Sequence, residues 1–152
     1  MSGVNSYQKY KEIVALPYFE KMYVKCQEII LKQGLGSFMN DSKWMRLYDF
    51  MNRWDEPPAF DYELLTQEEP LDILKKIPTY FSFWDYVTLD EDFIPFYAVR
   101  KLVIYGKREV YQGRLIKPLI VNLSAEIRAF LTLHKYPFIE EEEGVFLRTA
   151  YR

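Results

Sequence analysis

The residue types that most often carry out catalysis or bind metals are scarce in this chain. It contains one histidine, His134, and one cysteine, Cys26, among 152 residues. A Ser-His-Asp or Cys-His site needs a histidine beside its nucleophile, and a zinc site needs about four nitrogen, sulfur or carboxylate ligands. The chain also lacks phosphate-loop, dinucleotide-binding and calcium-loop motifs. We therefore expect no catalytic residue, no metal site and no cofactor.

The lone cysteine and the lone histidine have structural explanations. Cys26 recurs at steps of three and four residues with Phe19, Met22 and Ile29, which predicts one apolar face of a helix. A thiol on such a face behaves as a small buried apolar group. His134 falls near the end of a predicted helix, where a positive charge is favoured. Both residues are therefore interpreted as structural.

Carboxylates are the remaining candidates for chemistry, and they gather in two stretches. The stretches contain Glu140, Glu141, Glu142 and Glu143, and then Asp85, Asp90, Glu91 and Asp92 near Trp84. Adjacent like charges repel, so solvated loops are the simplest interpretation. The functional interpretation is an acidic surface that attracts a basic protein, provided that the fold brings the two stretches together. Trp84 would anchor that surface, although core packing is its favoured interpretation.

Net charge and hydropathy exclude several classes of protein. The formal net charge is −2 at pH 7 and basic residues form only short clusters, whereas nucleic-acid binders normally carry a basic stripe. No run approaches about 18 apolar residues, so no membrane-spanning helix is expected. One cysteine cannot form an internal disulfide, and no secretory leader is recognisable. These features predict a cytoplasmic protein that binds neither nucleic acid nor membranes.

The elements that must position these residues begin with a helical extension over residues 1–36. Helical periodicity over residues 5–33 is interrupted at Pro17, because proline cannot donate the helical hydrogen bond. Gly34 and Gly36 are predicted to end the second helix. A linker then leads into an α+β core over residues 38–152, and the whole chain of 152 residues is one predicted domain.

A third helix is predicted to begin after residue 40. Asp41 or Ser42 can cap it by accepting hydrogen bonds from its free N–H groups. Its apolar face comprises Trp44, Leu47, Tyr48 and Met51. We expect Trp44 to lie in the core and Trp54 to be partly exposed.

The period changes from helical to alternating after this helix, which indicates strands. The predicted elements are a strand over 60–64, a helical turn over 71–77, an irregular aromatic stretch over 80–89, a strand over 99–105, a helix capped by Ser124, a charged loop over 140–143 and a last strand over 145–151. In the first strand, Asp61 and Glu63 are expected to face solvent. This order predicts an α+β fold with a mainly antiparallel sheet and helices packed on one face.

The connection after residue 105 is predicted to be a tight hairpin. Gly106-Lys107 suits a short turn, because glycine adopts the backbone angles that such turns need. The return strand would run over residues 108–116, with Gly113 as a bulge.

Several short motifs resemble those of a family of small, uncharacterised bacterial proteins. The stretch Asn40-Asp41-Ser42-Lys43-Trp44 is similar to the Asn-Asn-Thr-Lys-Trp opening of that family, and the resemblance covers roughly residues 38–152. The matching positions singled out are Asn40, Lys43, Trp44, Gly113, Lys117 and Pro118. The resemblance implies a domain of unknown function from the bacterial cytoplasm and assigns no catalytic residues.

Three functions agree with these features. The leading hypothesis is a non-enzymatic protein-binding module, most concretely an immunity or antitoxin-like inhibitor that covers a partner's active site; a basic toxin domain would be such a partner. The second is a small hydrolase that uses a pair of carboxylates. The third is a self-associating structural or regulatory protein, and the sequence leaves the oligomeric state open. Binding that weakens with salt would favour the first hypothesis.

Overall fold

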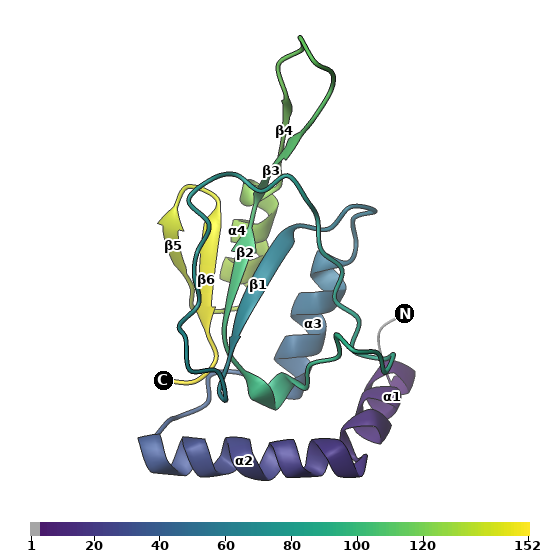
Figure 1. The fold of residues 1–152 in the computed structure, drawn as a ribbon, viewed down its shortest axis with the longest axis vertical. Coiled ribbons are helices and arrows are strands. Elements are labelled where there is room, and N and C mark those ends of the chain that lie inside the picture. The colour runs from purple at the N-terminus through teal and green to yellow at the C-terminus, as the bar shows by residue number, and fades with distance from the viewer. Residues whose placement is uncertain (1–3) are drawn as a thin grey trace.

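A four-stranded antiparallel sheet forms the centre of the computed structural model, which describes residues 4–152 (Figure 1). The strand order is β1 (Ala59–Leu64), β2 (Val99–Tyr105), β6 (Val145–Thr149) and β5 (Ile139–Glu142), and each neighbouring pair is antiparallel. The chain combines helices with antiparallel sheets, so the predicted α+β class is confirmed.

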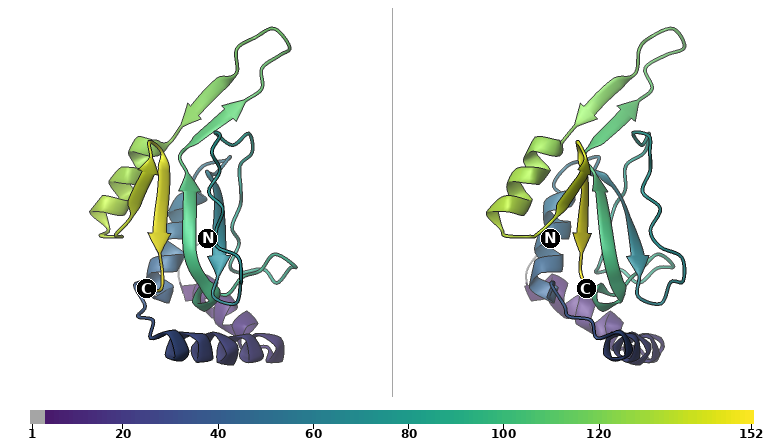
Figure 2. Two further views of the ribbon diagram at one scale, coloured as in Figure 1. Left: turned by 60° about the vertical axis from the view of Figure 1, so that its left-hand side comes forward. Right: turned by 90° about the vertical axis from the view of Figure 1, so that its left-hand side faces the viewer.

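Two helices cover one face of this sheet, as predicted. They are α3 (Asp41–Met51) and α4 (Ser124–Leu133), which lie on the same side of the strands in Figure 2. Leu102 and Ile104 of β2 pack with Tyr48 of α3 and Leu131 of α4 in one buried cluster. Burial of these apolar side chains holds the helices on the sheet.

The helical extension packs onto the same core. α1 (Val4–Val14) and α2 (Pro17–Gln33) cross one end of the sheet beside the short 3-10 turn η1 (Phe96–Ala98) (Figure 1). Pro17 opens α2 and Gly34 closes it in the left-handed conformation, as predicted. Tyr10 stacks on Phe96 with ring centroids 4.3 Å apart, and its hydroxyl accepts a 2.7 Å hydrogen bond from the Phe96 N–H.

Helix α3 buries the predicted face, but a different residue caps it. Trp44, Leu47, Tyr48 and Met51 are all buried. The cap is Asn40, not Asp41 or Ser42: its Oδ1 accepts a 2.8 Å hydrogen bond from the Lys43 N–H. Asparagine has the short polar side chain that this position favours. Trp54 is partly exposed, as expected.

The second face of the sheet is covered by an irregular segment, residues 65–78. No helical turn forms over residues 71–77, because the backbone there donates to side chains of the sheet. The Leu71 N–H donates to Glu63 Oε1 at 2.6 Å, and the Leu74 N–H donates to the Tyr105 hydroxyl at 2.9 Å. Glu63 is therefore buried, at 8% exposure, and the expectation that it faces solvent was wrong.

The predicted hairpin at Gly106-Lys107 is also wrong. The chain continues from β2 into β3 (Lys107–Val110), which pairs with β4 (Leu119–Asn122) and projects beyond the sheet (Figures 1 and 2). We call residues 107–122 the arm. Gly113 lies in the loop at its tip and is not a bulge.

Gly106 lies where the arm leaves the sheet, and a glycine is needed there because the β5–β6 turn and the start of α4 approach its backbone closely. Its N–H donates to the Gly144 carbonyl at 2.7 Å, and its carbonyl accepts from the Leu123 N–H at 2.7 Å. A Cβ atom on Gly106 would lie 2.5 Å from Ser124 Oγ, so any side chain would displace the start of α4. Ser124 itself is the first residue of α4 and does not cap it.

The glutamate run is a strand and its turn, where a charged loop was predicted. Glu140 lies in β5 and accepts two hydrogen bonds from the Arg128 guanidinium, at 2.9 and 2.8 Å. Its Oε2 also accepts from the Gly144 N–H at 3.0 Å. These contacts fix the β5–β6 turn against α4, which offsets the repulsion between adjacent carboxylates.

Candidate functional site

Two adjoining pockets flank the irregular aromatic stretch beside β1. One has a volume of about 510 Å³ and lies against the end of α3, and the other has about 410 Å³ and lies against β1. Phe83, Trp84 and Asp85 line both. Asp49 lines the first pocket, Asp90 and Asp92 line the second, and Asp85 lines both. We call these four carboxylates, with Phe83 and Trp84, the acidic site.

Trp84 forms the floor of the acidic site and is not an exposed anchor. Its side chain is only 6% exposed and stacks on Tyr48 with ring centroids 4.0 Å apart. Phe60 and Tyr62 of β1 contact it from the sheet side. The favoured interpretation of Trp84 as a core residue is therefore confirmed, and its proposed anchor role is wrong.

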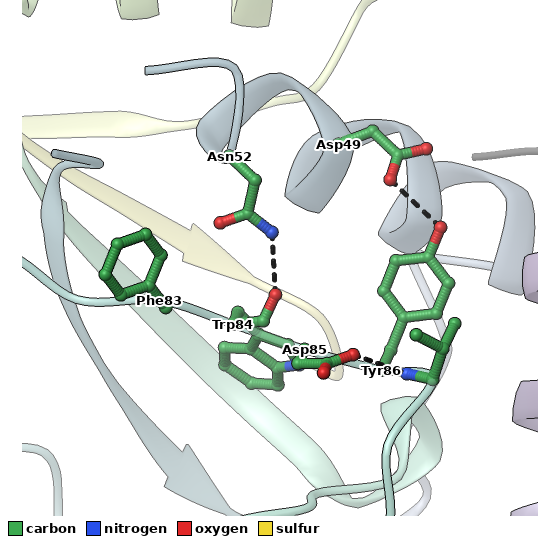
Figure 3. A pocket seen from close by; sticks show the side chains of 7 residues that line it. Asp49, Asn52, Phe83, Trp84, Asp85 and Tyr86 are labelled. Carbon is green, nitrogen blue, oxygen red and sulfur yellow. Dashed lines mark hydrogen bonds between the residues drawn. The ribbon is translucent and has the colours of Figure 1, made fainter. Parts of the chain in front are cut away.

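Helix α3 holds the irregular stretch in place through two side chains (Figure 3). The Asn52 amide donates to the Trp84 carbonyl at 2.7 Å, and the Tyr86 hydroxyl donates to Asp49 Oδ1 at 3.0 Å. Burial raises the pKa of Tyr86, and the Asp49 hydrogen bond raises it further, so the phenol stays protonated at neutral pH. This segment has no helix or strand of its own, so these bonds position it.

The acidic site gathers negative charge without a cation of its own. Asp85 Oδ1 accepts from the Val87 N–H and Asp90 Oδ1 from the Asp92 N–H, both at 2.8 Å. None of the ion pairs formed within residues 4–152 includes Asp49, Asp85 or Asp90. The last turn of α3 carries no basic residue either, although a helix C-terminus is the negative end of its dipole. The arrangement can therefore accept an ammonium or guanidinium group.

Exposed aromatic rings extend from the acidic site toward the arm. Phe83 is 64% exposed and meets Phe81 edge to face at a centroid distance of 5.4 Å. The Arg108 guanidinium at the base of the arm lies 5.2 Å from the Phe81 ring centroid and pairs with Glu56. The rings thus link the acidic site to the arm as one continuous surface. Sequence reasoning did not single out Phe83, Asp49 or Asn52.

The structure does not bring the two acidic stretches together. Glu140, Glu141 and Glu142 belong to β5, which is the sheet edge opposite β1. Two of the four glutamates are also compensated: Glu140 by Arg128, and Glu143 by Lys107 at 3.6 Å. Glu91, next to Asp90 and Asp92, is exposed and lines neither pocket of the acidic site. The predicted single acidic surface is therefore reduced to the acidic site.

The arm exposes apolar side chains, some of which the sequence interpretation placed in a return strand over residues 108–116. The exposed ones are Tyr111, Leu115, Ile116, Leu119 and Ile120. Leu115 at the tip is 96% exposed. Contiguous exposed apolar residues of this kind are typical of protein contact sites. Gly113, Lys117 and Pro118, which carry part of the family resemblance, lie in the same tip.

The other residues of the resemblance cluster at the start of α3. Asn40 caps the helix, and Trp44 is buried between Tyr48 and Phe96 at centroid distances of 5.5 and 6.0 Å. The Lys43 carbonyl accepts a 2.8 Å hydrogen bond from the Tyr136 hydroxyl. These residues therefore fix α3 to the turn after α4.

The described part of the chain offers few other groups that could act in catalysis or bind a metal ion. Cys26 is buried, and His134 ends α4 with its ring 4.5 Å from that of Phe130, as the structural interpretation predicted. Within residues 4–152, no three His, Cys, Asp or Glu side chains are grouped to hold a metal ion. No helix in the same range combines the length and apolarity that crossing a bilayer requires.

Comparison with known proteins gives one match. A family model described as a family of unknown function, DUF6678, matches residues 26–150. The match begins inside α2, so it starts earlier than the predicted residue 38. No curated protein and no solved structure matches the chain.

Proposed function

Because the chain belongs to DUF6678, a family of unknown function, we propose a function from the geometry alone: a protein-binding module whose acidic site receives a basic surface of another protein. The observation that carries this proposal is the set of carboxylates without a cation beside the exposed Phe83 ring. Carboxylates attract an arginine or lysine, and an aromatic ring adds a cation–π contact. The proposed module binds its partner without catalysing a reaction.

The concrete form of the proposal is an immunity or antitoxin-like inhibitor in the bacterial cytoplasm. Such an inhibitor would cover the active site of a basic toxin domain, with the acidic site opposite the groove that normally takes an anionic substrate. The net charge of −2 and the exposed rings next to the arm support a partner that is basic and partly apolar. The buried, unpaired Cys26 suits a reducing compartment.

Affinity capture from a bacterial lysate at two salt concentrations tests this proposal. At about 0.1 M salt the Debye length is about 10 Å, and at about 1 M it is about 3 Å, so the contacts of exposed charges are screened at high salt. We expect one stoichiometric basic partner at low salt and much less of it at high salt. Equal capture at both concentrations, or no stoichiometric partner, would contradict the proposal.

Self-association is the second candidate function, and the arm is the observation that favours it. Its tip presents Leu115 and Ile116 to solvent, and exposed apolar side chains of this kind are typical of contacts between proteins. Light scattering across a concentration series tests it: a mass that doubles in the wild type, and stays monomeric in Leu115→Ser/Ile116→Ser, would support this candidate. A monomer at every concentration would remove it.

A further inference from the structure

A pocket of opposite charge lies at the other end of α3. It has a volume of about 480 Å³ and lies between the linker before α3 and the turn after α4. Its cationic lining residues are Lys43, Lys135 and Arg148, and none of the described residues that line it is Asp or Glu. None of the three forms an ion pair within residues 4–152. We call it the basic pocket.

Arg148 is a buried cation without a counter-ion. It is 4% exposed and lies on β6, where its guanidinium donates to the Pro137 carbonyl at 2.9 Å and to the Phe38 carbonyl. Its Nε is buried and has no hydrogen-bond partner in the described part of the chain. Burial of an uncompensated charge is costly, and it lowers the pKa of Arg148. A bound anion nearby would offset that cost.

Lys135 stands in a backbone conformation that usually belongs to glycine or asparagine. It follows α4 with a φ of 59°, the one non-glycine residue with a positive φ among residues 4–152. This is the left-handed residue that commonly closes a helix, and the Tyr136 N–H after it donates to the Leu131 carbonyl at 2.9 Å, so the turn holds Lys135 in place. Lys135 is exposed and belongs to the lining of the basic pocket.

The first turn of α3 adds positive potential to the same pocket. Asn40 and Lys43 line it, and although Asn40 caps the Lys43 N–H, this end of the helix is the positive end of its dipole. The nearest acidic side chain in sequence, Asp41, is turned elsewhere: it accepts from the Tyr7 hydroxyl at 3.1 Å and lines the pocket beside α1 and α2. It therefore does not neutralise the lysines.

We propose that the basic pocket binds the phosphate group of a small phosphorylated molecule. Three cations and a helix N-terminus match a doubly charged anion better than a single carboxylate, and lysine is a common phosphate ligand. The volume exceeds what a phosphate alone would fill, and it falls in the range of pockets that hold small-molecule ligands. The exposed Phe38 and Pro137 would contact the organic part of the ligand. This inference does not depend on the acidic site.

Amide NMR titration of the full chain tests the proposal with two probes, inorganic phosphate and adenosine monophosphate. Sodium chloride at matched ionic strength controls for salt. We expect saturable shifts at the amides of residues 37–43, 135 and 136 with either phosphate source and none with chloride. Tighter binding of the nucleotide would assign the pocket to a phosphate ester, and equal binding would assign it to phosphate itself. No saturable shift up to about 10 mM, well above a Kd of about 1 mM, would overturn the proposal.

Substitutions that preserve the fold sharpen this test. Lys43→Gln and Lys135→Gln each remove one charged contact, so binding should weaken roughly tenfold in each. Lys21→Gln on the exposed side of α2 removes the same charge elsewhere and should leave binding unchanged. Equal affinity in all three variants would contradict the proposal. Neutralising Asp85, Asp90 and Asp92 should leave phosphate binding intact, so a failure here is distinct from a failure of the acidic site.

Discussion

At the scale of single residues, Glu140 shows that one carboxylate has a structural role within a run that the sequence predicts to be a solvated loop. The hydrogen bonds from Arg128, and then from the Gly144 N–H, lower the pKa of Glu140 to about 2. The charged form of this side chain therefore stabilises the folded state. Its neighbour Glu141 is exposed and forms no ion pair within residues 4–152, although the two look equivalent in the sequence.

The pH dependence of stability follows from this lowered pKa. Glu140 contributes its stability fully above the unfolded-state pKa of about 4.3, and that contribution is lost as the pH falls toward the folded-state pKa of about 2. We expect Glu140→Gln to lower the thermal unfolding midpoint at pH 7 and to match the wild type near pH 2. Glu141→Gln is the matched control and should follow the wild type throughout. A constant gap between Glu140→Gln and the wild type would contradict the assignment.

Gly106 is the second residue whose role depends on contacts from distant segments. A methyl group there would meet Ser124 Oγ at 2.5 Å and the Gly144 carbonyl at 3.2 Å. We expect Gly106→Ala to lower the free energy of unfolding by about 1–3 kcal/mol, the usual cost of overpacking, in a denaturant titration. At Gly36 the same methyl group would find its nearest neighbour 3.9 Å away, so Gly36→Ala should change stability by less than about 0.5 kcal/mol. Similar losses at both positions would show that Gly106 is not closely packed.

At the scale of elements, the arm and the body of the protein should respond differently to loss of apolar side chains. Leu115 and Ile116 in the arm are exposed, whereas Leu131 in α4 is buried against the sheet. We expect Leu115→Ser/Ile116→Ser to change the free energy of unfolding by less than about 0.5 kcal/mol, because neither side chain supports the core. Leu131→Ala should cost about 2–5 kcal/mol. A large loss of stability from the arm variant would mean that the arm packs on the body.

The elements that the sequence predicts well are those fixed by local patterns. The helices on either side of Pro17 and the buried face of α3 follow from periodicity and from the chemistry of proline and glycine. The helical turn over 71–77 and the hairpin at Gly106 were wrong, because sheet residues or other distant segments decide both conformations. In the segment 71–77, backbone N–H groups donate to the side chains of Glu63 and Tyr105. At Gly106, the backbone is hydrogen-bonded to the backbones of Gly144 and Leu123.

The candidate site follows the same division between local and distant causes. Asp85, Asp90 and Asp92 are close in sequence and therefore stay together around one loop. Asp49 joins them only because α3 packs beside that loop, 37 positions from its partner Tyr86. The glutamates at 140–143 lie on the opposite edge because β6 and β2 separate β5 from β1. No local pattern encodes that strand order.

At the scale of the whole molecule, α3 separates two regions of opposite charge. The basic pocket lies at its N-terminus and the acidic site at its C-terminus, about 16 Å apart for a helix of 11 residues. Each region has the same sign as the helix dipole at that end, so neither is neutralised by the helix. The net charge of the chain is only −2, although within residues 4–152 it contains two regions of opposite charge without ion pairs, the basic pocket and the acidic site. This distribution agrees with the proposed binding of a basic partner at one end of α3 and a phosphate group at the other.

The most direct test of the acidic site is the affinity of the captured partner for three forms of the chain. Asp85→Asn/Asp90→Asn/Asp92→Asn removes the charges but keeps an oxygen for the backbone hydrogen bonds of the loop. The control Glu28→Gln/Glu68→Gln/Glu69→Gln removes the same charge from exposed positions elsewhere. We predict that the aspartate variant binds at least about tenfold more weakly at low salt, while the control binds like the wild type. Equal affinity of the two variants would contradict it.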